Sequence, residues 1–311
     1  MTEHSHNHGE SQNNGAGKRK KPTSAYRKLR RKLAKTKLRA PLLWYRHRGL
    51  SPSDVFFGSY PRSGSTWSRF TLFEIMTGQE SGFVAVNAAM HGVGGHKTGM
   101  AALPGNGRMI NTHEKYRNEY KKAIYVVRDV RDVALSEFAY TTAIEFFHGD
   151  MDKFLTTFLC KKISPFGPWQ SQVGSWLDSP IAGTPNMLLL RYEDLRKDPL
   201  EAFTRMVDFL GVKADTSRIQ RAIANNSLNK MKEKEEREPV RASVKDRFVR
   251  NGLVQGWRSK LSMSQVQFIE QYTGSILRRL GYPLVSDETT TAEVGISPEL
   301  QSVSASSRLG R

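Results

Sequence analysis

Ten residues, Gly58-Ser-Tyr-Pro-Arg-Ser-Gly-Ser-Thr-Trp67, connect an apolar run to a helical pattern and decide the fold prediction. The apolar run begins at Asp54 and ends in turn residues at Pro61, which is typical of a short buried strand. Residues 63–77 are helical in composition and are followed by Gly78, a common helix terminator. The segment therefore predicts a strand, a tight loop and a helix.

The same alternation continues along the chain. Further strands are predicted at residues 108–113, 122–127 and 186–192, and further helices at residues 129–140, 199–210, 215–226 and 263–280. Residues 80–107 are rich in Gly, Ala, Met and Asn, which predicts a long functional or mobile loop. Alternating strands and helices indicate an α/β fold: one domain with a mostly parallel central sheet and helices on both faces.

The loop between the first strand and the first helix has the composition of a phosphate-binding site. Gly64 lets the backbone approach an anion closely, and the amides of Ser63, Gly64, Ser65 and Thr66 lie at a helix N-terminus. The two hydroxyl side chains add donors, and Arg62 adds a permanent positive charge.

This loop differs from the one in nucleotide triphosphatases. Five residues separate Gly58 from Gly64, and no lysine precedes the hydroxyl pair, so the GxxxxGK[ST] pattern is absent. A magnesium- and ATP-dependent phosphotransferase of the P-loop type is therefore the weaker alternative, and no metal is expected.

The net charge of +18 is unevenly distributed. Residues 1–50 hold 14 Lys or Arg and two acidic residues, Glu3 and Glu10, so about two-thirds of the charge belongs to an N-terminal arm. This argues against a nucleic-acid-binding fold. Residues 24–48 include a basic amphipathic pattern that suits peripheral membrane contact, an acidic partner, or docking on the protein's own domain.

Composition suggests the boundaries of the folded part. We expect a basic arm over residues 1–50 with disorder over 1–23, a globular domain over 51–285, and a disordered tail over 286–311. The single cysteine, Cys160, suits a reducing compartment, and the N-terminus lacks the apolar region of a signal peptide. We therefore expect a cytoplasmic protein, with peripheral membrane association as an option left open.

Six segments in a fixed order resemble the family of sulfotransferases that use 3′-phosphoadenosine 5′-phosphosulfate (PAPS) as sulfuryl donor. Besides the loop at 58–67, they are Asn111-Thr-His113, the stretch from Val126 to Ser136, Arg191-Tyr192-Glu-Asp-Leu, Ser227-Leu-Asn-Lys-Met-Lys, and the stretch from Phe248 to Trp257. Together they span residues 54 to about 260. The resemblance implies a P-loop-like domain and transfer of a sulfuryl group from PAPS to a hydroxyl or amine.

The resemblance also implies roles for single residues. His113 corresponds to the general base, and Arg62 lies where the sulfuryl group meets the leaving phosphate. The remaining residues expected to bind the donor are Ser63, Gly64, Ser65, Thr66, Trp67, Arg128, Ser136, Tyr192, Ser227, Arg250, Asn251 and Gly252. Among these, Arg128, Ser136 and Arg250 would hold the 3′-phosphate, while Trp67 and Tyr192 would contact the adenine.

Several positions depart from the family pattern. Arg62 stands where cytosolic members of the family carry a lysine, and an arginine does not donate its proton usefully at neutral pH. Asn111 replaces the lysine before Thr-His, so a second cation at the sulfuryl group is not expected. Asn251 and Gln255 also replace family residues in the closing loop, and the family's dimer signature is absent, so the oligomeric state is not predicted.

The acceptor is expected to be a small molecule with an apolar or aromatic body. Aromatic residues gather where the family builds its acceptor pocket, at Phe138, Tyr140, Phe146, Phe147, Phe154, Phe158, Phe166 and Trp169. Ordinary helix packing is the better-supported explanation of such aromatics. A non-catalytic basic protein that binds membranes or nucleic acid is the remaining alternative, and it leaves the loop at 58–67 and His113 unexplained.

Overall fold

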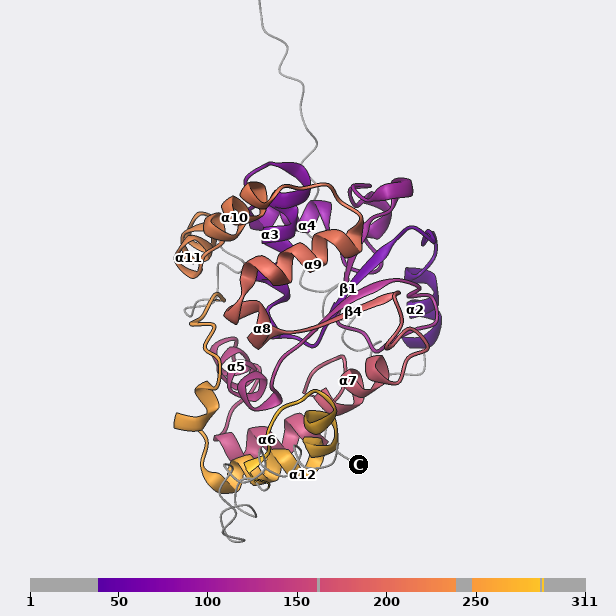
Figure 1. Ribbon diagram of the computed structural model, residues 1–311. Coiled ribbons are helices and arrows are strands. Elements are labelled where there is room, and N and C mark those ends of the chain that lie inside the picture. The colour runs from indigo at the N-terminus through magenta and orange to yellow at the C-terminus, as the bar shows by residue number, and fades with distance from the viewer. Residues whose placement is uncertain (1–38, 161–162, 239–247, 286, 288–311) are drawn as a thin grey trace, which may run out of the picture. The chain divides into compact units, whose positions relative to one another are not determined.

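The computed structural model describes residues 39–160, 163–238, 248–285 and 287 (Figure 1). The chain divides into two units, Met1–Leu42 and Leu43–Arg311, and helix α2 (Arg39–Arg46) spans that division. The disorder predicted for residues 1–23 and for 288–311, and most of the basic segment at 24–48, lie outside the described residues. The arm, domain and tail boundaries stay predictions. The sheet and the helices that cover it all belong to the second unit.

Within the described residues the sheet has four parallel strands in the order β2-β1-β3-β4. They are β1 (Val55–Ser59), β2 (Met109–Thr112), β3 (Ala123–Val127) and β4 (Met187–Arg191). Every residue of β1 and β3 is buried, which explains their continuous apolar sequences. The α/β prediction with a parallel sheet is confirmed.

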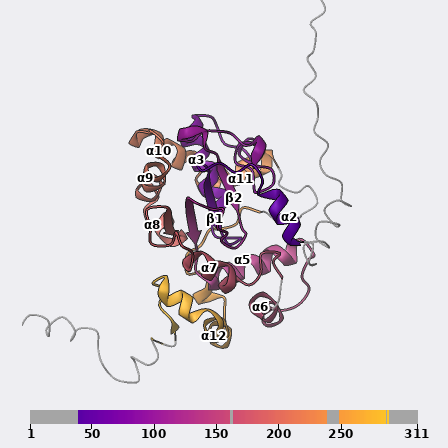
Figure 2. The same cartoon turned by 90° about the vertical axis from the view of Figure 1, so that its right-hand side faces the viewer.

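Helices cover both faces of the sheet (Figures 1 and 2). On one face lie α3 (Ser65–Thr77), α4 (Phe83–Ala89), α9 (Pro199–Leu210), α10 (Thr216–Asn225) and α11 (Leu228–Arg237). On the other lie α5 (Val130–Ala143), α6 (Met151–Cys160), α7 (Trp169–Leu177) and α12 (Met263–Arg279). The short helices are α8 (Tyr192–Lys197) and the 3₁₀ turns η1 (His96–Thr98), η2 (Pro104–Asn106) and η3 (Gly256–Ser259).

Strand alternation divides the core into two clusters. Phe57 and Ile124 join the cluster beneath α3 and α9, while Phe56 and Tyr125 join the cluster beneath α7 and α12. In the second cluster the Tyr125 ring stacks on Trp176 with 4.8 Å between ring centroids. Because the four strands are parallel, their carboxyl ends lie at one edge of the sheet, between the helical layers.

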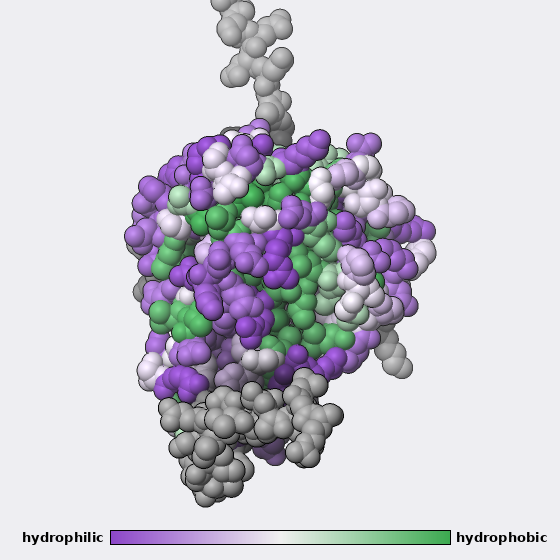
Figure 3. All heavy atoms as spheres, viewed as in Figure 1, coloured by the Kyte–Doolittle hydropathy of each residue, from purple (hydrophilic) through white to green (hydrophobic). Residues whose placement is uncertain are grey.

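The outer strand β4 is less covered than the others. Its burial varies along its length, and Leu189 is 36% exposed. Figure 3 shows hydrophobic residues gathered over β4 and extending toward α7, between hydrophilic areas. This sheet edge therefore contributes apolar surface on that face.

The prediction of a long loop at residues 80–107 is wrong in part. The segment contains α4, η1 and η2, because Phe83 packs against Phe70 of α3 with 4.8 Å between ring centroids. That contact comes from the tertiary fold and has no signal in a Gly-rich window. Helices α6, α7, α8 and α11 were not predicted, and the strand expected to reach Tyr192 ends at Arg191.

A buried ion pair joins α11 to α3. Lys234 Nζ lies 2.8 Å from Glu74 Oε1, and it also donates to Ser81 Oγ at 2.7 Å and Asn226 Oδ1 at 2.9 Å. Burial alone would raise the pKa of Glu74, but the bonds from Lys234, Ser81 and Asn225 outweigh it and lower that pKa. The cluster satisfies both charges away from water.

Glu74→Ala is expected to lower the free energy of unfolding by roughly 3–5 kcal/mol, because it leaves the Lys234 ammonium buried without its carboxylate. Urea denaturation measures the change. Glu233→Ala is the matched control, since its pair with Lys230 is exposed and should contribute about 0–1 kcal/mol. Equal losses in both variants would contradict the role of burial.

Candidate active site

The loop after β1 has the backbone geometry of an anion cradle. Arg62 has φ of 71° and Gly64 has φ of 90°, both in the left-handed region, and Gly64 precedes the first turn of α3. No side chain of the described residues caps that turn, so its amides are open to a ligand there. Ser63 Oγ is buried and has no hydrogen-bond partner among the described residues.

Tyr192, at the carboxyl end of β4, packs directly on this loop. A Cβ atom at Gly64 would lie 2.5 Å from the Tyr192 ring, so residue 64 must be glycine for reasons of both space and backbone angle. The Tyr192 hydroxyl donates to the Gly252 carbonyl at 3.1 Å. Tyr192 therefore lies between the phosphate loop and the segment at 248–257.

Arg128, at the end of β3, links the same two segments. Its Nη1 donates to the Arg62 carbonyl at 3.0 Å and its Nη2 donates to the Leu253 carbonyl at 2.7 Å. The guanidinium lies 4.6 Å from the centre of the Tyr192 ring. Arg128 is buried, and its Nε has no hydrogen-bond partner in the part of the chain that the structure describes. It can bind a further anion through that atom.

His113 follows β2 and is held in one tautomer. Its Nδ1 lies 2.8 Å from the Ser59 carbonyl oxygen, which can only accept, so Nδ1 carries the hydrogen and Nε2 carries a lone pair. Burial lowers the His113 pKa to about 4, and the charges of Arg69 and Arg62 act in the same direction. The imidazole is therefore neutral at pH 7, with Nε2 ready to accept a proton.

The Arg62 side chain is enclosed by three residues. Its Nε lies 3.5 Å from Glu137 Oε2, and its guanidinium lies 3.7 Å from the centre of the Tyr140 ring and 4.8 Å from that of Phe248. Burial raises the pKa of Glu137, and the Arg62 charge opposes that rise. Arg62 therefore adds a charge near the loop that stays protonated at every relevant pH.

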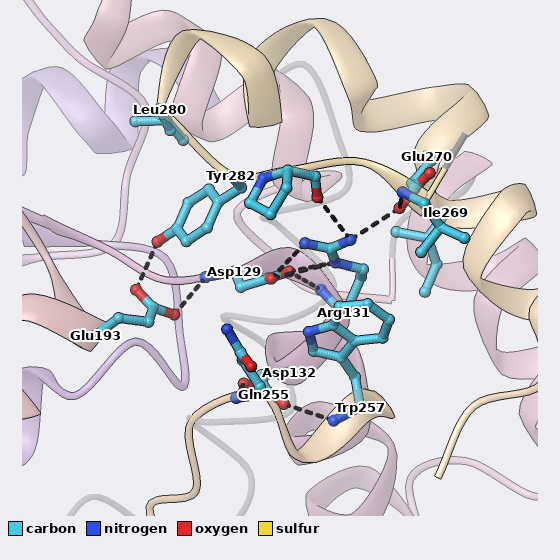
Figure 4. A network of polar contacts seen from close by, with 12 residues as sticks. Asp129, Arg131, Asp132, Glu193, Gln255, Trp257, Ile269, Glu270, Leu280 and Tyr282 are labelled. Atoms are coloured by element: carbon cyan, nitrogen blue, oxygen red, sulfur yellow. Dashed lines mark hydrogen bonds and ion pairs between the residues drawn. The ribbon is translucent and has the colours of Figure 1, made fainter. Parts of the chain in front are cut away.

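A buried charge network joins the start of α5 to α12, next to the site (Figure 4). Asp132 accepts from the amides of Gln255 at 2.8 Å and Trp257 at 3.0 Å, which holds the segment that Arg128 contacts. One residue earlier, Arg131 pairs with Asp129 at 2.7 Å and with Glu270 at 2.8 Å. The loop over Arg128 is thus fixed to the start of α5.

The motifs that build this site belong to a known family. The model of the sulfotransferase domain matches residues 52–281, which is more than half of the chain. This chain belongs to the sulfotransferase family. The match confirms the family and the enzyme class that the six ordered motifs indicated.

Relatives of the chain are themselves sulfotransferases. Luciferin sulfotransferase of Photinus pyralis is 24% identical over 267 residues, which cover 71% of this chain and 70% of that protein. Sulfotransferase 1A1 of Bos taurus is 24% identical over 247 residues, covering 71% of this chain and 82% of that protein.

Solved structures share the fold of this sulfotransferase domain. A mouse sulfotransferase complexed with PAP has a TM-score of 0.60 at 22% identity and covers 76% of this chain and 88% of that one. Retinol dehydratase in complex with retinol and PAP has a TM-score of 0.61 at 23% identity, and the match covers 76% of this chain and 86% of that one. These likenesses confirm the α/β architecture.

The fold brings together only part of the predicted sulfotransferase site. Arg62, Gly64, Arg128, Tyr192 and Gly252 contact one another around the phosphate loop. Ser63, Ser65 and Thr66 belong to that loop and to the first turn of α3, and His113 is bonded to Ser59 at the end of β1. Five other predicted residues lie apart from those contacts: Trp67 packs edge-on against Phe203, Ser136 is half-buried on α5, and Ser227, Arg250 and Asn251 are exposed. Contact with the donor stays a prediction for every one of the predicted residues.

Sequence reasoning missed the residues that act on the site from other elements. Glu137 and Arg69 both lie inside helical patterns in which they resemble surface charges. Asp132 lies inside the motif at 126–136, but no local signal separates it from the neighbouring charges. Among the described residues, no group of three or more His, Cys, Asp or Glu is placed to hold a metal, and no helix is long and apolar enough to cross a membrane.

A histidine titration checks the geometry at His113. We expect its imidazole to titrate near pH 4 with Nε2 unprotonated above that value, because burial and two arginines disfavour the charged form. Nitrogen NMR of the ligand-free protein, assigned with His113→Gln, measures both the pKa and the tautomer. Since an unfolded histidine titrates near 6.5, this residue's contribution to stability is complete above about pH 6.5 and is lost as pH falls toward 4. A pKa near 6.5, or a hydrogen on Nε2, would contradict this picture.

Proposed function

We propose that this sulfotransferase moves a sulfuryl group from PAPS to a hydroxyl or amine of a small-molecule acceptor. The observation that carries the proposal is the convergence, at one sheet edge, of the phosphate loop, Arg128, Tyr192 and a neutral His113. Parallel α/β sheets bind ligands at that edge. The PAP in two structural relatives supports the same donor class.

The donor's phosphates fit polar groups that have no hydrogen-bond partner in the described part of the chain. The first-turn amides of α3 and the buried Ser63 Oγ would bind the 5′-phosphate, and Arg128 Nε would bind the 3′-phosphate. Ser65 and Thr66 add hydroxyl donors to the first group. Ser136, Arg250, Asn251 and Gly252 would complete the 3′-phosphate contacts, with Trp67, Tyr192 and Ser227 around the adenine.

The transfer is an in-line displacement in which the protein supplies position, charge and a base. The donor supplies an activated sulfur bonded to a phosphate leaving group. His113 Nε2 receives the acceptor's proton while the acceptor oxygen or nitrogen bonds to sulfur and the bond from sulfur to the phosphate oxygen breaks. Arg62 stabilises the negative charge that develops on that oxygen, and as an arginine it donates no proton.

The acceptor region is less aromatic than the sequence suggested. Phe154, Phe158 and Trp169 are fully buried in the core, so they pack helices and line no pocket. Tyr140 contacts Arg62, and Phe166 lies edge-on to His113 with 5.5 Å between ring centroids. These two rings border the catalytic groups and suit an acceptor with a partly apolar body. Retinol in one structural relative is a molecule of that kind.

A second part of the proposal concerns the membrane. Trp44 and Tyr45 are 57% and 65% exposed, and Arg48 lies over the Trp44 ring at 4.2 Å. Exposed aromatics beside arginines suit the interface of an anionic bilayer. They follow the basic sequence of residues 24–38, which supports peripheral association of a cytoplasmic enzyme.

Calorimetry with 3′,5′-ADP (PAP, the desulfated product) tests the donor site. We expect it to bind at least about 100-fold more tightly than 5′-AMP, because a charge-assisted contact to the 3′-phosphate is worth about 3 kcal/mol. Arg128→Ala should remove that preference, while Arg237→Ala, on an exposed ion pair, should keep it. Equal binding of 3′,5′-ADP, 5′-AMP and ATP would refute the proposal and reopen the phosphotransferase alternative.

His113→Gln separates the base from the donor site. The variant should bind 3′,5′-ADP like the wild type. It should lose sulfuryl transfer by about 100-fold or more, because the glutamine amide is too weak a base to take the acceptor's proton. Transfer from ³⁵S-labelled PAPS to a panel of phenols, alcohols and amines measures the loss. Wild-type turnover in the variant would remove His113 from the mechanism.

A further inference from the structure

Arg69 is a buried cation without a counter-ion among the described residues. It lies on α3, one turn after the phosphate loop, and only 9% of it is exposed. Its guanidinium donates to Asn87 Oδ1 at 3.5 and 3.4 Å and to the Met90 carbonyl at 3.3 Å. All three bonds are long and go to neutral oxygens. Over the described ranges no carboxylate pairs with Arg69, and its Nε has no hydrogen-bond partner.

This arrangement is costly to the fold. A guanidinium withdrawn from water is stabilised only when anions or several good acceptors replace its hydration. Burial lowers the pKa of Arg69 to about 10, with no opposing contribution from a carboxylate, and the side chain stays charged at pH 7. An uncompensated buried charge at the edge of an active site indicates a ligand.

Arg69 lies on the same face of the sheet as Asn111. Met109 of β2 belongs to the core cluster beneath α3, and alternate residues of a strand share a face, so Asn111 points to that side too. The charge of Arg69 lowers the pKa of His113 more than that of Arg62 does. In addition, Asn111 Oδ1 is buried without a hydrogen-bond partner among the described residues.

The contacts of Arg69 place its guanidinium on the side of the site formed by β2. Arg128 and Tyr192 follow β3 and β4, on one side of β1, whereas β2 with His113 after it lies on the other side. The Met90 carbonyl that accepts from Arg69 lies next to residues 91–93, which pair with Asn111 at the outer edge of β2. Arg69 is thus held beside Asn111, at the edge of the sheet away from Arg128 and Tyr192.

We propose that Arg69 binds a negatively charged group of the acceptor, so that the substrate is a small acid, a carboxylate or its phosphate or sulfonate equivalent, bearing the hydroxyl or amine that is sulfated. The inference rests on the proposed function and names its substrate class. The anion of the acceptor neutralises Arg69, while its hydroxyl or amine lies at His113 Nε2. Asn111 Oδ1 accepts a hydrogen from the same molecule. Neutral acceptors of the same shape leave the Arg69 charge uncompensated and bind less well.

Matched pairs of probes test the proposal. The 2-, 3- and 4-hydroxybenzoates are compared with the corresponding hydroxybenzamides, by calorimetry in the presence of saturating 3′,5′-ADP. For at least one isomer, wild type should bind the acid about tenfold or more tightly than the amide. Arg69→Met should abolish that difference and Arg69→Lys should keep part of it, whereas Arg237→Met should keep all of it.

Several results would overturn the proposal. The first is that wild type binds no acid more tightly than its amide, or binds no probe at all. The second is an acid preference that survives in Arg69→Met. The third is that inorganic sulfate, and no acid, binds together with 3′,5′-ADP to wild type and is lost in Arg69→Met, because Arg69 would then bind the donor's sulfuryl group. The affinity for 3′,5′-ADP alone should be equal in all variants. A loss of that affinity would therefore report a defect of the donor site, which is distinct from a loss of acid binding.

Thermal unfolding adds a readout that a structural role would not give. Because the charge is buried without a counter-ion in the described part of the chain, Arg69→Met is expected to raise the melting temperature of the ligand-free protein while it removes acid binding. A lower melting temperature with an unchanged acid preference would make Arg69 a structural link between Asn87 and Met90. If the methionine variant does not fold, Arg69→Gln and Arg69→Lys carry the same comparison.

Discussion

The structure depends most on the buried charge of Arg131. It is 1% exposed and pairs with Asp129 and Glu270, donates to the Pro283 carbonyl and lies 4.0 Å from the centre of the Trp257 ring (Figure 4). A guanidinium at this depth is stable only with all these partners in place. The start of α5, helix α12, the segment after it and the loop at 255–257 are therefore fixed together.

The candidate active site is built on that constraint. Asp132, next to Arg131, holds the amides of the loop at 255–257, and Arg128, one turn earlier, contacts the same loop and the phosphate loop. Glu193 extends the network to α8, because it accepts from the Asp129 amide at 3.1 Å and from the Tyr282 hydroxyl at 2.6 Å. The groups that we propose to bind the donor thus belong to one connected network.

Buried cations in this protein fall into two kinds. Arg131 and Lys234 have carboxylate partners within 2.8 Å, as expected of charges that hold elements together. Arg62 has a longer contact to Glu137, at 3.5 Å, and Arg69 has no carboxylate among the described residues. Arg128 also has only a long contact, at 4.0 Å to Asp132. The weakly paired cations are thus the ones that we propose to bind the donor or the acceptor.

The sequence by itself determined the four strands, the phosphate loop and the family, because buried strands and glycine-rich turns carry local patterns, as at residues 54–78. It indicated His113 and Arg128, since both lie in segments that resemble the family's motifs. Only the tertiary structure decided the tautomer of His113, the enclosure of Arg62 and the isolation of Arg69, because each depends on groups from distant elements. The tertiary structure also decided that residues 80–107 contain helices and that most of the aromatic residues are buried. Local propensity records what a segment can form, whereas desolvation and charge compensation arise from contacts that no single segment contains.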